Sequence, residues 1–346
     1  MNNRGMQQDH LPPYDALLLV SFGGPDRPAD VVPFLENVLR GRNVPRERMH
    51  EVAEHYYHFG GRSPLNEQNL ALIGALKARL AAAGPHLPIY WGNRNWQPLL
   101  PATLRQMAGD GVRRALALVT SAYASYSGCR QYLENIAAAQ AEVGSQAPQV
   151  EKLRLFYNHP LFIEATADRV RAALGQISLD RRRAARLVFT AHSIPQVMAD
   201  HCRYQVQLGE TCRLVAAEAG ISDWRLVYQS RSGPPAQPWL GPDILEELRQ
   251  QASAGAQDVV VAPVGFLSDH LEVLYDLDTE AQRLCGELGL NMIRAATVGT
   301  HPKFVEMIHE LIVERVLPGT PRRAIGHFGP DYNDCPADCC LSGRVK

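Results

Sequence analysis

His192 stands at the end of an apolar run, where a side chain is well placed for chemistry. It follows the segment RLVFTA, and Ser193 and Pro195 come directly after it. Because proline lacks the N–H that a strand ladder needs, the strand should end here and present the imidazole at its carboxyl end. Histidine is the commonest metal ligand and titrates near neutral pH. The position predicts metal binding or proton transfer, and a hydrogen-bonded structural histidine is the alternative.

Three carboxylates recur at every fourth position in a second candidate segment. Glu272, Asp276 and Glu280 have the spacing that stacks side chains on one face of a helix. Like charges at this spacing destabilise a helix by about 0.2–0.5 kcal/mol per pair, and no Lys or Arg lies between residues 267 and 282. The row predicts a path for cations or protons, with a solvated acidic face as the alternative. His270, in the same first turn, would orient a carboxylate or cap the helix.

A histidine and a carboxylate together form a ligand set for ferrous iron. Imidazole and carboxylate suit divalent first-row metals, and selectivity among these metals comes from geometry and availability. We expect His192 and Glu272 to face each other from opposite halves of the molecule, with the metal between them.

The elements that position these residues follow an α/β pattern. Short β-branched runs, followed by Gly or Ser and then by helix-period segments, are typical of βα units around a parallel sheet. Two similar halves are expected to meet near residues 175–184. Strands are expected near residues 16–22, 87–91, 113–121, 151–156, 185–191, 224–229, 257–264 and 289–294, and helices at 67–83, 131–143, 160–174 and 212–219. Ligands should bind beyond the carboxyl ends of the strands.

The composition indicates an ordinary globular chain. Its 346 residues correspond to roughly two domains. A net charge of −1 gives no electrostatic footprint for nucleic acid, so we expect no such partner. Runs of about 18 apolar residues, which would predict a transmembrane segment, do not occur. The first residues lack the apolar core of a signal peptide, so a cytoplasmic location is expected.

Aromatic residues and glycines near other strand ends favour a flat ligand. Phe22 precedes two glycines, and Tyr126 and Tyr132 follow the third expected strand. Such residues let a flat, largely apolar ligand approach the backbone, although core packing would also explain them. Arg40 would pair with a ligand carboxylate or remain a solvated surface charge. The motifs GxGxxG, GxxxxGK[ST] and GxSxG are missing, so nucleotide-cofactor and serine-hydrolase interpretations lose their main support.

Three of the seven cysteines crowd the end of the chain. Cys335, Cys339 and Cys340 lie in a segment rich in Pro and Gly that begins near residue 317. Such a pattern is a poor disulfide framework for a cytosolic chain, and metal binding is the better interpretation.

Eight segments of the chain form a recognisable set. They are LLLVSFGGPDRP, FLENVLRGRNVP, HYYHFGGRSPLN, YWGNRNWQP, VTSAYASYSGCRQY, FTAHSIP, QSRSGPPAQPWLGPD and PVGFLSDHLEVLYDLD. Together they closely resemble the ferrochelatases, which insert ferrous iron into a porphyrin. The resemblance extends from about residue 14 to 316, and two of its segments, AHSIP and GFLSDHLEVLYDLD, are highly specific at this separation.

The resemblance implies a fold and a set of chemical roles. It implies two Rossmann-like domains, each with a four-stranded parallel sheet flanked by helices, and a porphyrin in the cleft between them. We expect an N-terminal domain at 14–178, a C-terminal domain at 183–316 and a Cys-rich extension at 317–346. With ferrous iron as substrate, His192 and Glu272 match the positions of metal and proton chemistry.

Further residues match the family motifs beside this pair. Asp276 and Glu280 match the acidic row that leads away from the pair. Ser63 and Tyr132 match porphyrin-contact positions, and Tyr126 is a weaker candidate. Phe22 and Asn95 depart from the family pattern, because some relatives carry Tyr and His there. Other enzymes of heme biosynthesis are candidate partners.

The tail and the run SAYASYSGCRQYLEN are most similar to the branch found in actinobacteria and similar bacteria, whose substrate is coproporphyrin III. The alternative substrate is protoporphyrin IX. The alternative reaction is insertion of another metal, such as cobalt or nickel, and the non-catalytic alternative is a tetrapyrrole or metal carrier. Some members hold a [2Fe-2S] cluster with three C-terminal cysteines and one internal cysteine. Cys335, Cys339 and Cys340 resemble the terminal set, although the adjacent pair departs from the expected spacing. One cluster-bearing branch has its internal cysteine where Ala165 stands here, so Cys129 is the substitute.

Overall fold

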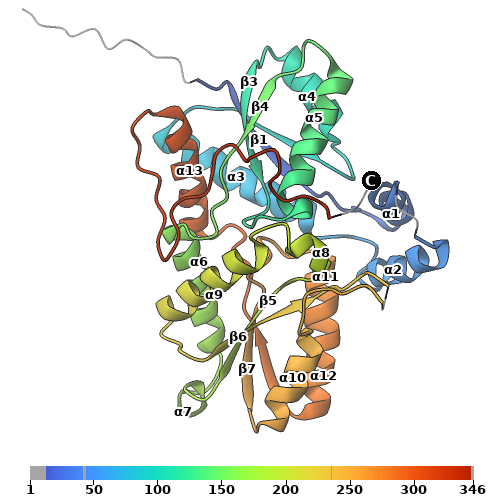
Figure 1. Cartoon of the computed structure of the whole chain (residues 1–346), viewed down its shortest axis with the longest axis vertical. Helices are drawn as coiled ribbons and strands as arrows, with labels where there is room; N and C mark the ends of the chain where they lie inside the picture. The colour runs from blue at the N-terminus through green and yellow to red at the C-terminus, as the bar shows by residue number, and fades with distance from the viewer. Residues whose placement is uncertain (1–12, 42–43, 235, 344–346) are drawn as a thin grey trace, which may run out of the picture.

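Two parallel sheets of four strands form the frame of the molecule (Figure 1). The computed structural model describes residues 13–41, 44–234 and 236–343. The strand orders are β2-β1-β3-β4 and β6-β5-β7-β8, so the two sheets repeat one topology. The predicted pair of α/β halves is confirmed. The strands are β1 (Ala16–Ser21), β2 (Ile89–Asn93), β3 (Arg114–Val119), β4 (Gln149–Lys152), β5 (Arg186–His192), β6 (Trp224–Gln229), β7 (Asp258–Ala262) and β8 (Asn291–Arg294).

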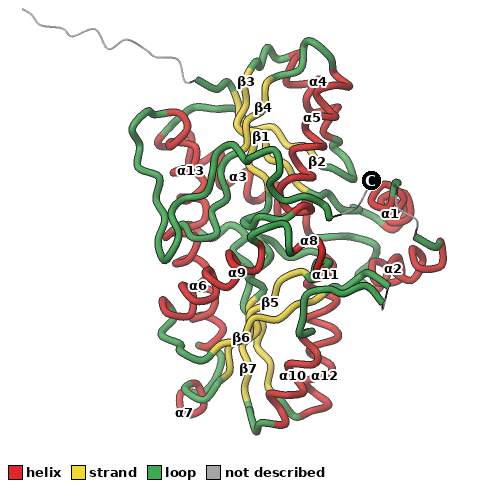
Figure 2. The backbone as a smooth tube through the Cα atoms, in the orientation of Figure 1, coloured by secondary structure: helices red, strands yellow, loops and turns green. Residues whose placement is uncertain are grey.

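Helices cover both sheets, as βα crossovers require. Figure 2 shows them as red coils around the yellow strands. In the first half they are η1 (Pro28–Asp30), α1 (Val31–Leu39), α2 (Arg46–His58), α3 (Leu65–Ala83), α4 (Leu100–Gly109), η2 (Tyr126–Arg130), α5 (Gln131–Val143), α6 (Pro160–Leu174) and α7 (Leu179–Arg182). In the second half they are α8 (Gln196–Ala199), α9 (Tyr204–Glu218), α10 (Ile244–Ser253), α11 (Leu271–Val273), η3 (Leu274–Ala281), α12 (Gln282–Leu288) and α13 (Pro302–Val316).

The central strands are buried on both faces. All six residues of β1 and all five of β7 are buried, which is why their sequences read as continuous apolar runs. The fourth strand covers residues 149–152 and not the expected 151–156, because its ladder with β3 ends at Lys152. The expected helix at 212–219 begins earlier, at Tyr204.

The acidic segment is a π-helix and not the α-helix that its spacing predicts. Only residues 271–273 form an α-helical turn, and residues 274–281 are π-helical. In a π-helix each N–H bonds five residues back, which widens the turn, and such segments are frequent at functional sites. A second π-helical segment, η2, follows β3.

Two helices link the halves of the chain. α13 packs against α3 and α6, and α6 also packs against α9 and β7. One apolar cluster accordingly includes side chains from both sheets, such as Leu19 and Phe189. This part of the buried core spans both sheets, and the division of the chain into domains stays a prediction.

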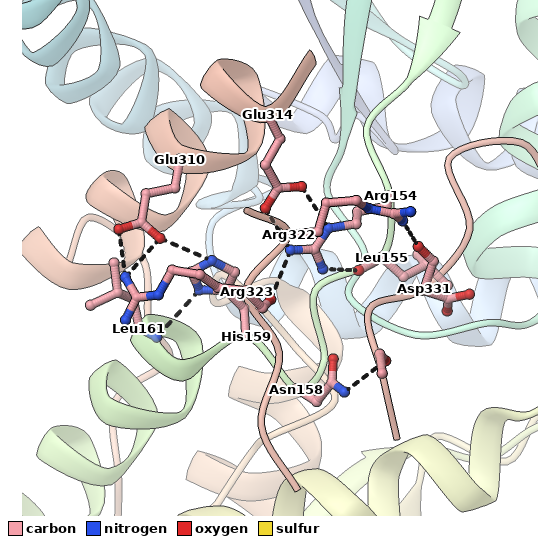
Figure 3. A network of polar contacts seen from close by, with 11 residues as sticks. Arg154, Leu155, Asn158, His159, Leu161, Glu310, Glu314, Arg322, Arg323 and Asp331 are labelled. Carbon is pink, nitrogen blue, oxygen red and sulfur yellow. Dashed lines mark hydrogen bonds and ion pairs between the residues drawn. The ribbon is translucent and has the colours of Figure 1, made fainter. Parts of the chain in front are cut away.

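The tail after α13 lies over the junction of the two halves, as the green loop of Figure 2 shows. A polar network attaches it to the segment 154–159 (Figure 3). Arg154 forms a buried, two-pronged ion pair with Glu314 of α13, at 2.8 and 2.7 Å, and donates to the carbonyl of Arg323 in the tail. Asn158 donates to the tail carbonyls of Phe328 and Gly329. Within the described residues, no helix is long and apolar enough to cross a membrane.

Candidate active site

His192 and Glu272 meet at the carboxyl end of the second sheet. Their closest side-chain atoms, Nε2 and Oε2, are 3.6 Å apart, and the two side chains are 33% and 48% exposed. The other ring nitrogen of His192, Nδ1, contacts the carbonyl of Ser193. This contact orients the ring so that Nε2 faces the carboxylate. The predicted meeting of the two residues agrees with this geometry.

The expectation that the pair comes from opposite halves is wrong. His192 ends β5 and Glu272 follows β7, and these two strands are neighbours in one sheet. A close approach of the backbone brings them together, because a Cβ atom on Gly265 would lie 2.6 Å from Ala191 of β5. Neighbouring parallel strands end at the same sheet edge, so residues far apart in sequence meet there.

The pair is ionised at neutral pH. Burial alone would lower the pKa of His192, but the negative charge of Glu272 outweighs it and raises this pKa to about 9. Burial would likewise raise the pKa of Glu272, but His192 lowers it to about 2. The site therefore holds an imidazolium beside a carboxylate.

His270 caps the short helix that carries Glu272. Its Nδ1 accepts a hydrogen bond from the backbone N–H of Glu272 at 3.1 Å and lies 3.8 Å from Oε2 of the same residue. Burial lowers the pKa of His270, which keeps the ring neutral and Nδ1 free to accept. Its ring packs edge-on against Phe266. Of the two roles expected for this residue, the structure places it in the cap.

Asp276 lies one turn further along, in the π-helix. Its Oδ2 accepts hydrogen bonds from the hydroxyl of Ser230 and, at 3.3 Å, from the amide of Gln229. Burial, with the nearby charge of Glu272, raises its pKa to about 7 against the opposing hydrogen bond from Ser230. Asp276 can therefore both take up and release a proton near neutral pH.

Glu280 continues the row in different surroundings. Burial raises its pKa, Arg283 lowers it, and Asp243 at the start of α10 raises it. The charges that act on Glu280 therefore differ from those that act on Asp276, and the environment of the row changes along its length.

Two neighbouring residues of α2 reach this segment from the first half of the chain. The ring of His55 stacks on Tyr275, with centroids 3.7 Å apart and planes 10° from parallel. The charge of Glu272 reaches Tyr56 and, after burial, is a second cause of the raised pKa of its hydroxyl. Figure 1 shows α2 projecting on the same side as α11. Sequence reasoning missed both contacts, because nothing in the α2 pattern points to a partner 220 residues away.

An aromatic group with one cation occupies the corresponding edge of the first sheet. The guanidinium of Arg94 lies 4.5 Å from the ring centre of Tyr132 and 5.6 Å from that of Phe22. Phe22 also packs edge-on against Phe34, which contacts Tyr56 in turn. Arg94 and these rings thus connect Tyr132 with Tyr56 of α2.

The remaining predicted porphyrin contacts have other neighbours. Ser63 is buried against Gly24, where an added Cβ would lie 2.7 Å from that of Ser63. Arg40 is exposed and donates to Asn37 at 2.5 Å. The hydroxyl of Tyr126 donates to Glu134 at 2.9 Å. The hydrogen bond of Arg40 joins residues three positions apart, and that of Tyr126 joins residues eight positions apart.

Comparison with known proteins identifies the family. The family model for ferrochelatases matches residues 14–316. A ferrochelatase of Rhodopirellula baltica is 58% identical, with 96% of this chain and 94% of that protein aligned. The chain belongs to the ferrochelatase family. It is therefore an enzyme of the metal chelatase class, with ferrous iron as substrate.

Other relatives carry a more specific name. A coproporphyrin III ferrochelatase of Streptomyces griseus is 50% identical over 96% of this chain and 95% of its own length. One of Nocardia farcinica is 51% identical over 95% of this chain and 97% of its own length. Among solved structures, SirB of Bacillus subtilis with Fe³⁺ has a TM-score of 0.55 at 11% identity, covering 87% of this chain and 95% of that one. This last likeness supports the fold alone.

The cysteines of the tail gather around an internal cysteine in this ferrochelatase. Cys129 is buried beside Cys335, Cys339 and Cys340, and the sulfurs of the last two are 3.4 Å apart. The thiol of Cys129 donates to Cys335 and, helped by the charge of Lys152, lowers the pKa of the Cys335 thiol. Within the described residues, no group of three or more His, Cys, Asp or Glu side chains is arranged to hold a metal ion. Cys202 packs against the same group. Thiols are the donors that hold iron–sulfur clusters in proteins.

Proposed function

We propose that this ferrochelatase inserts ferrous iron into coproporphyrin III, yielding iron coproporphyrin III for heme b biosynthesis. The observation that carries the insertion chemistry is the ionised His192–Glu272 pair. The choice of porphyrin is supported by the relatives named for coproporphyrin III at 50–51% identity. A cytoplasmic location goes with this proposal.

In the pair, Glu272 carries a negative charge that can attract the metal, and His192 carries a proton that it can release. Insertion replaces the two protons of the inner pyrrole nitrogens with one Fe²⁺, so two protons must leave the site in each turnover. The carboxylate of Glu272 is ionised and attracts the arriving cation. The approach of a dication lowers the proton affinity of His192, which frees its Nε2 to contact the metal or to accept a pyrrole proton. The two residues thus share metal delivery and proton removal.

Asp276 and Glu280 are the proposed exit for the protons. Asp276, with a pKa of about 7, accepts a proton from the pair and releases it without a large energetic step. Glu280 follows it along the same helical segment. His192 and Glu272 supply only two ligands, fewer than a structural metal site would have. Such a small ligand set is suited to this reaction, because the porphyrin nitrogens must finally displace the protein ligands from the iron.

A side-by-side assay tests the choice of porphyrin. Purified enzyme is given Fe²⁺ without oxygen and either coproporphyrin III or protoporphyrin IX, and metallation is followed by absorption. We expect kcat/KM for coproporphyrin III to be higher by at least an order of magnitude, since two further carboxylates offer charge for specific binding. Preference for protoporphyrin IX would favour direct formation of protoheme. The Glu272→Gln variant measures the rate without the proposed pair.

A tetrapyrrole or metal carrier is the second candidate function. A carrier would bind porphyrin or iron in this site without turnover. Multiple turnovers per protein molecule exclude it, and a single equivalent of product that remains bound favours it. The acidic row argues against a carrier, because a carrier has no protons to export.

The cysteine group is the proposed seat of a [2Fe-2S] cluster. Its four ligands would be Cys129, Cys335, Cys339 and Cys340. The positive charge of Lys152 would offset the negative charge of the thiolates. Arg130 holds the tail by donating to the carbonyls of Ala337 and Cys339. When bound, the cluster would supply a redox centre.

Metal and sulfide analysis of purified protein tests the cluster. We expect about two irons and two sulfides per chain, with visible absorption that disappears in the Cys335→Ser variant. The Cys285→Ser variant is the matched control, because Cys285 is buried in another cluster of the core. Equal iron and sulfide in all three proteins would contradict the assignment.

A further inference from the structure

Ser230 has a backbone conformation that is unusual for a residue with a side chain. Its φ is +61°, and among the described residues only Cys340 is a second non-glycine residue with positive φ. For a residue with a Cβ this left-handed region is sterically costly, and glycine would adopt it freely. Residues kept in such conformations cluster at functional sites. Ser230 directly follows β6, at the same sheet edge as His192.

The unusual backbone lets two successive side chains reach one carboxylate. Successive residues of a regular strand point to opposite faces of the sheet. Gln229 and Ser230 nevertheless both donate to Oδ2 of Asp276. The turn at Ser230 thus allows its hydroxyl to reach the acceptor that the Gln229 amide also contacts. An extended residue at 230 would point its side chain away from Asp276.

Gln229 ties the same acidic segment to the catalytic histidine. It is the register partner of His192, and its carbonyl accepts the backbone N–H of Ser193 at 2.8 Å. Its amide also donates to the backbone carbonyl of Glu272 at 3.3 Å. The side chain is 1% exposed, and its Oε1 has no hydrogen-bond partner within the described part of the chain. A buried acceptor left open in this way costs stability, as the strain at Ser230 does.

We propose that Ser230, together with Gln229, is a positioning residue for metal insertion, which holds the Asp276 carboxylate in place beside the His192–Glu272 pair. The inference rests on the proposed role of the acidic row. Two residues that each carry a conformational or hydrogen-bonding cost make their contacts on one side chain of that row. The contact fixes the place of Asp276 relative to both β5 and the start of α11.

Three substitutions at Ser230 separate the hydroxyl from the backbone conformation. Ser230→Gly removes the hydroxyl and relieves the strain, and Ser230→Ala removes the hydroxyl but keeps the Cβ. Ser230→Asn keeps a donor on a residue that tolerates positive φ. We expect kcat to fall roughly tenfold in the Gly and Ala variants, the size expected for losing a hydrogen bond to a charged group. The KM for porphyrin should not change, and Ser230→Asn should recover much of kcat.

Thermal stability distinguishes positioning from a general structural role. Ser230→Gly should melt at or above the wild-type temperature although it is slow, since its backbone strain is gone. A merely structural role would lower both the melting temperature and kcat. Ser232→Gly, an exposed serine in the same loop, is the matched control and should keep wild-type kcat.

A double-mutant cycle with Asp276→Asn closes the test. If Ser230 acts through Asp276, Ser230→Gly should cause no further loss of kcat in the Asp276→Asn background. If Asp276→Asn itself has the kcat of the wild type, both the proposed role of the acidic row in proton exit and the positioning role of Ser230 are overturned. A slow Asp276→Asn combined with wild-type kcat in Ser230→Gly, or with independent losses in the double variant, would overturn the positioning role alone.

Discussion

The two sheets share one topology but carry different chemistry at their carboxyl ends. In each, the third strand along the chain, β3 or β7, leads into a π-helical segment, η2 or η3. At the edge of the first sheet, the guanidinium of Arg94 contacts the rings of both Phe22 and Tyr132. The edge of the second has the titratable residues His192 and Glu272. The repeated fold supplies equivalent positions, and we infer that one edge presents a surface for a flat ring while the other supplies charge and protons.

The largest expected effect comes from the second edge. His192→Ala should lower the rate of iron insertion about a thousandfold, because general acid–base groups typically contribute factors of about 10² to 10⁴. Porphyrin affinity should remain within a few-fold of wild type if the first edge holds the ring. Anaerobic single-turnover assays and fluorescence titration with porphyrin measure the two quantities. Full turnover in this variant would remove His192 from the reaction.

The pH dependence should also reflect the second edge alone. The pKa of Asp276 is raised to about 7, so this carboxyl is protonated below that pH and cannot accept a proton from the pair. We expect kcat to fall by up to about tenfold per unit as the pH drops below 7. Asp276→Asn should be slow and should lack this acidic limb. A limb of the same shape in Asp276→Asn would assign it to another group.

At the first edge we expect a smaller effect, on the KM for porphyrin and not on kcat. Arg94→Ala removes the cation that lies between Tyr132 and Phe22, so the rings lose their common neighbour. Cation–π contacts contribute about 0.5–2 kcal/mol. Porphyrin binding can lose at most this free energy through the contact, so the porphyrin KM should rise by no more than about thirtyfold. We expect kcat to change little. Arg105→Ala, which breaks an exposed ion pair with Glu142, is the control. A loss of kcat with constant KM in Arg94→Ala would contradict the assignment of ring binding to the first edge and of the reaction to the second.

The smallest effect should come from the contact between the two regions. His55→Ala removes the ring that stacks on Tyr275, and aromatic pairs contribute about 0.5–1.5 kcal/mol. We expect both kcat and KM to change by a few-fold, because the stack joins α2 to the helix that carries Asp276. His55→Phe should restore them, and the exposed His50→Ala should be neutral. Wild-type kinetics in His55→Ala would show that the regions work without this contact.

Sequence reasoning reached the elements whose signals are local. Continuous apolar runs revealed β1 and β7 because both faces of a central parallel strand are buried. His192 was found because a proline follows it closely and fixes the end of its strand. The spacing of Glu272 and Asp276 indicated one helical face but not the π-helix, since a widened turn keeps residues four apart close together.

Other features depend on contacts between distant segments. Ser230 looks like an ordinary turn residue in the sequence. The partner of its hydroxyl, Asp276, lies 46 positions later, and only the fold brings the two together. The expected C-terminal domain at 183–316 already contains both His192 and Glu272, and the strand order, which puts β5 beside β7, places them in one sheet. Cys129 meets the tail through the path of residues 317–340 across the junction, which no local pattern encodes.

The central claim is that His192 and Glu272 act as one coupled, ionised pair. NMR titration of the His192 ring, assigned by its loss in His192→Ala, measures this coupling directly. We expect a pKa of about 9 in the wild type and a value at or below the ordinary 6.5 or so in Glu272→Gln, because burial then acts without the opposing carboxylate. A His192 pKa that is near its ordinary value in both proteins would contradict the account.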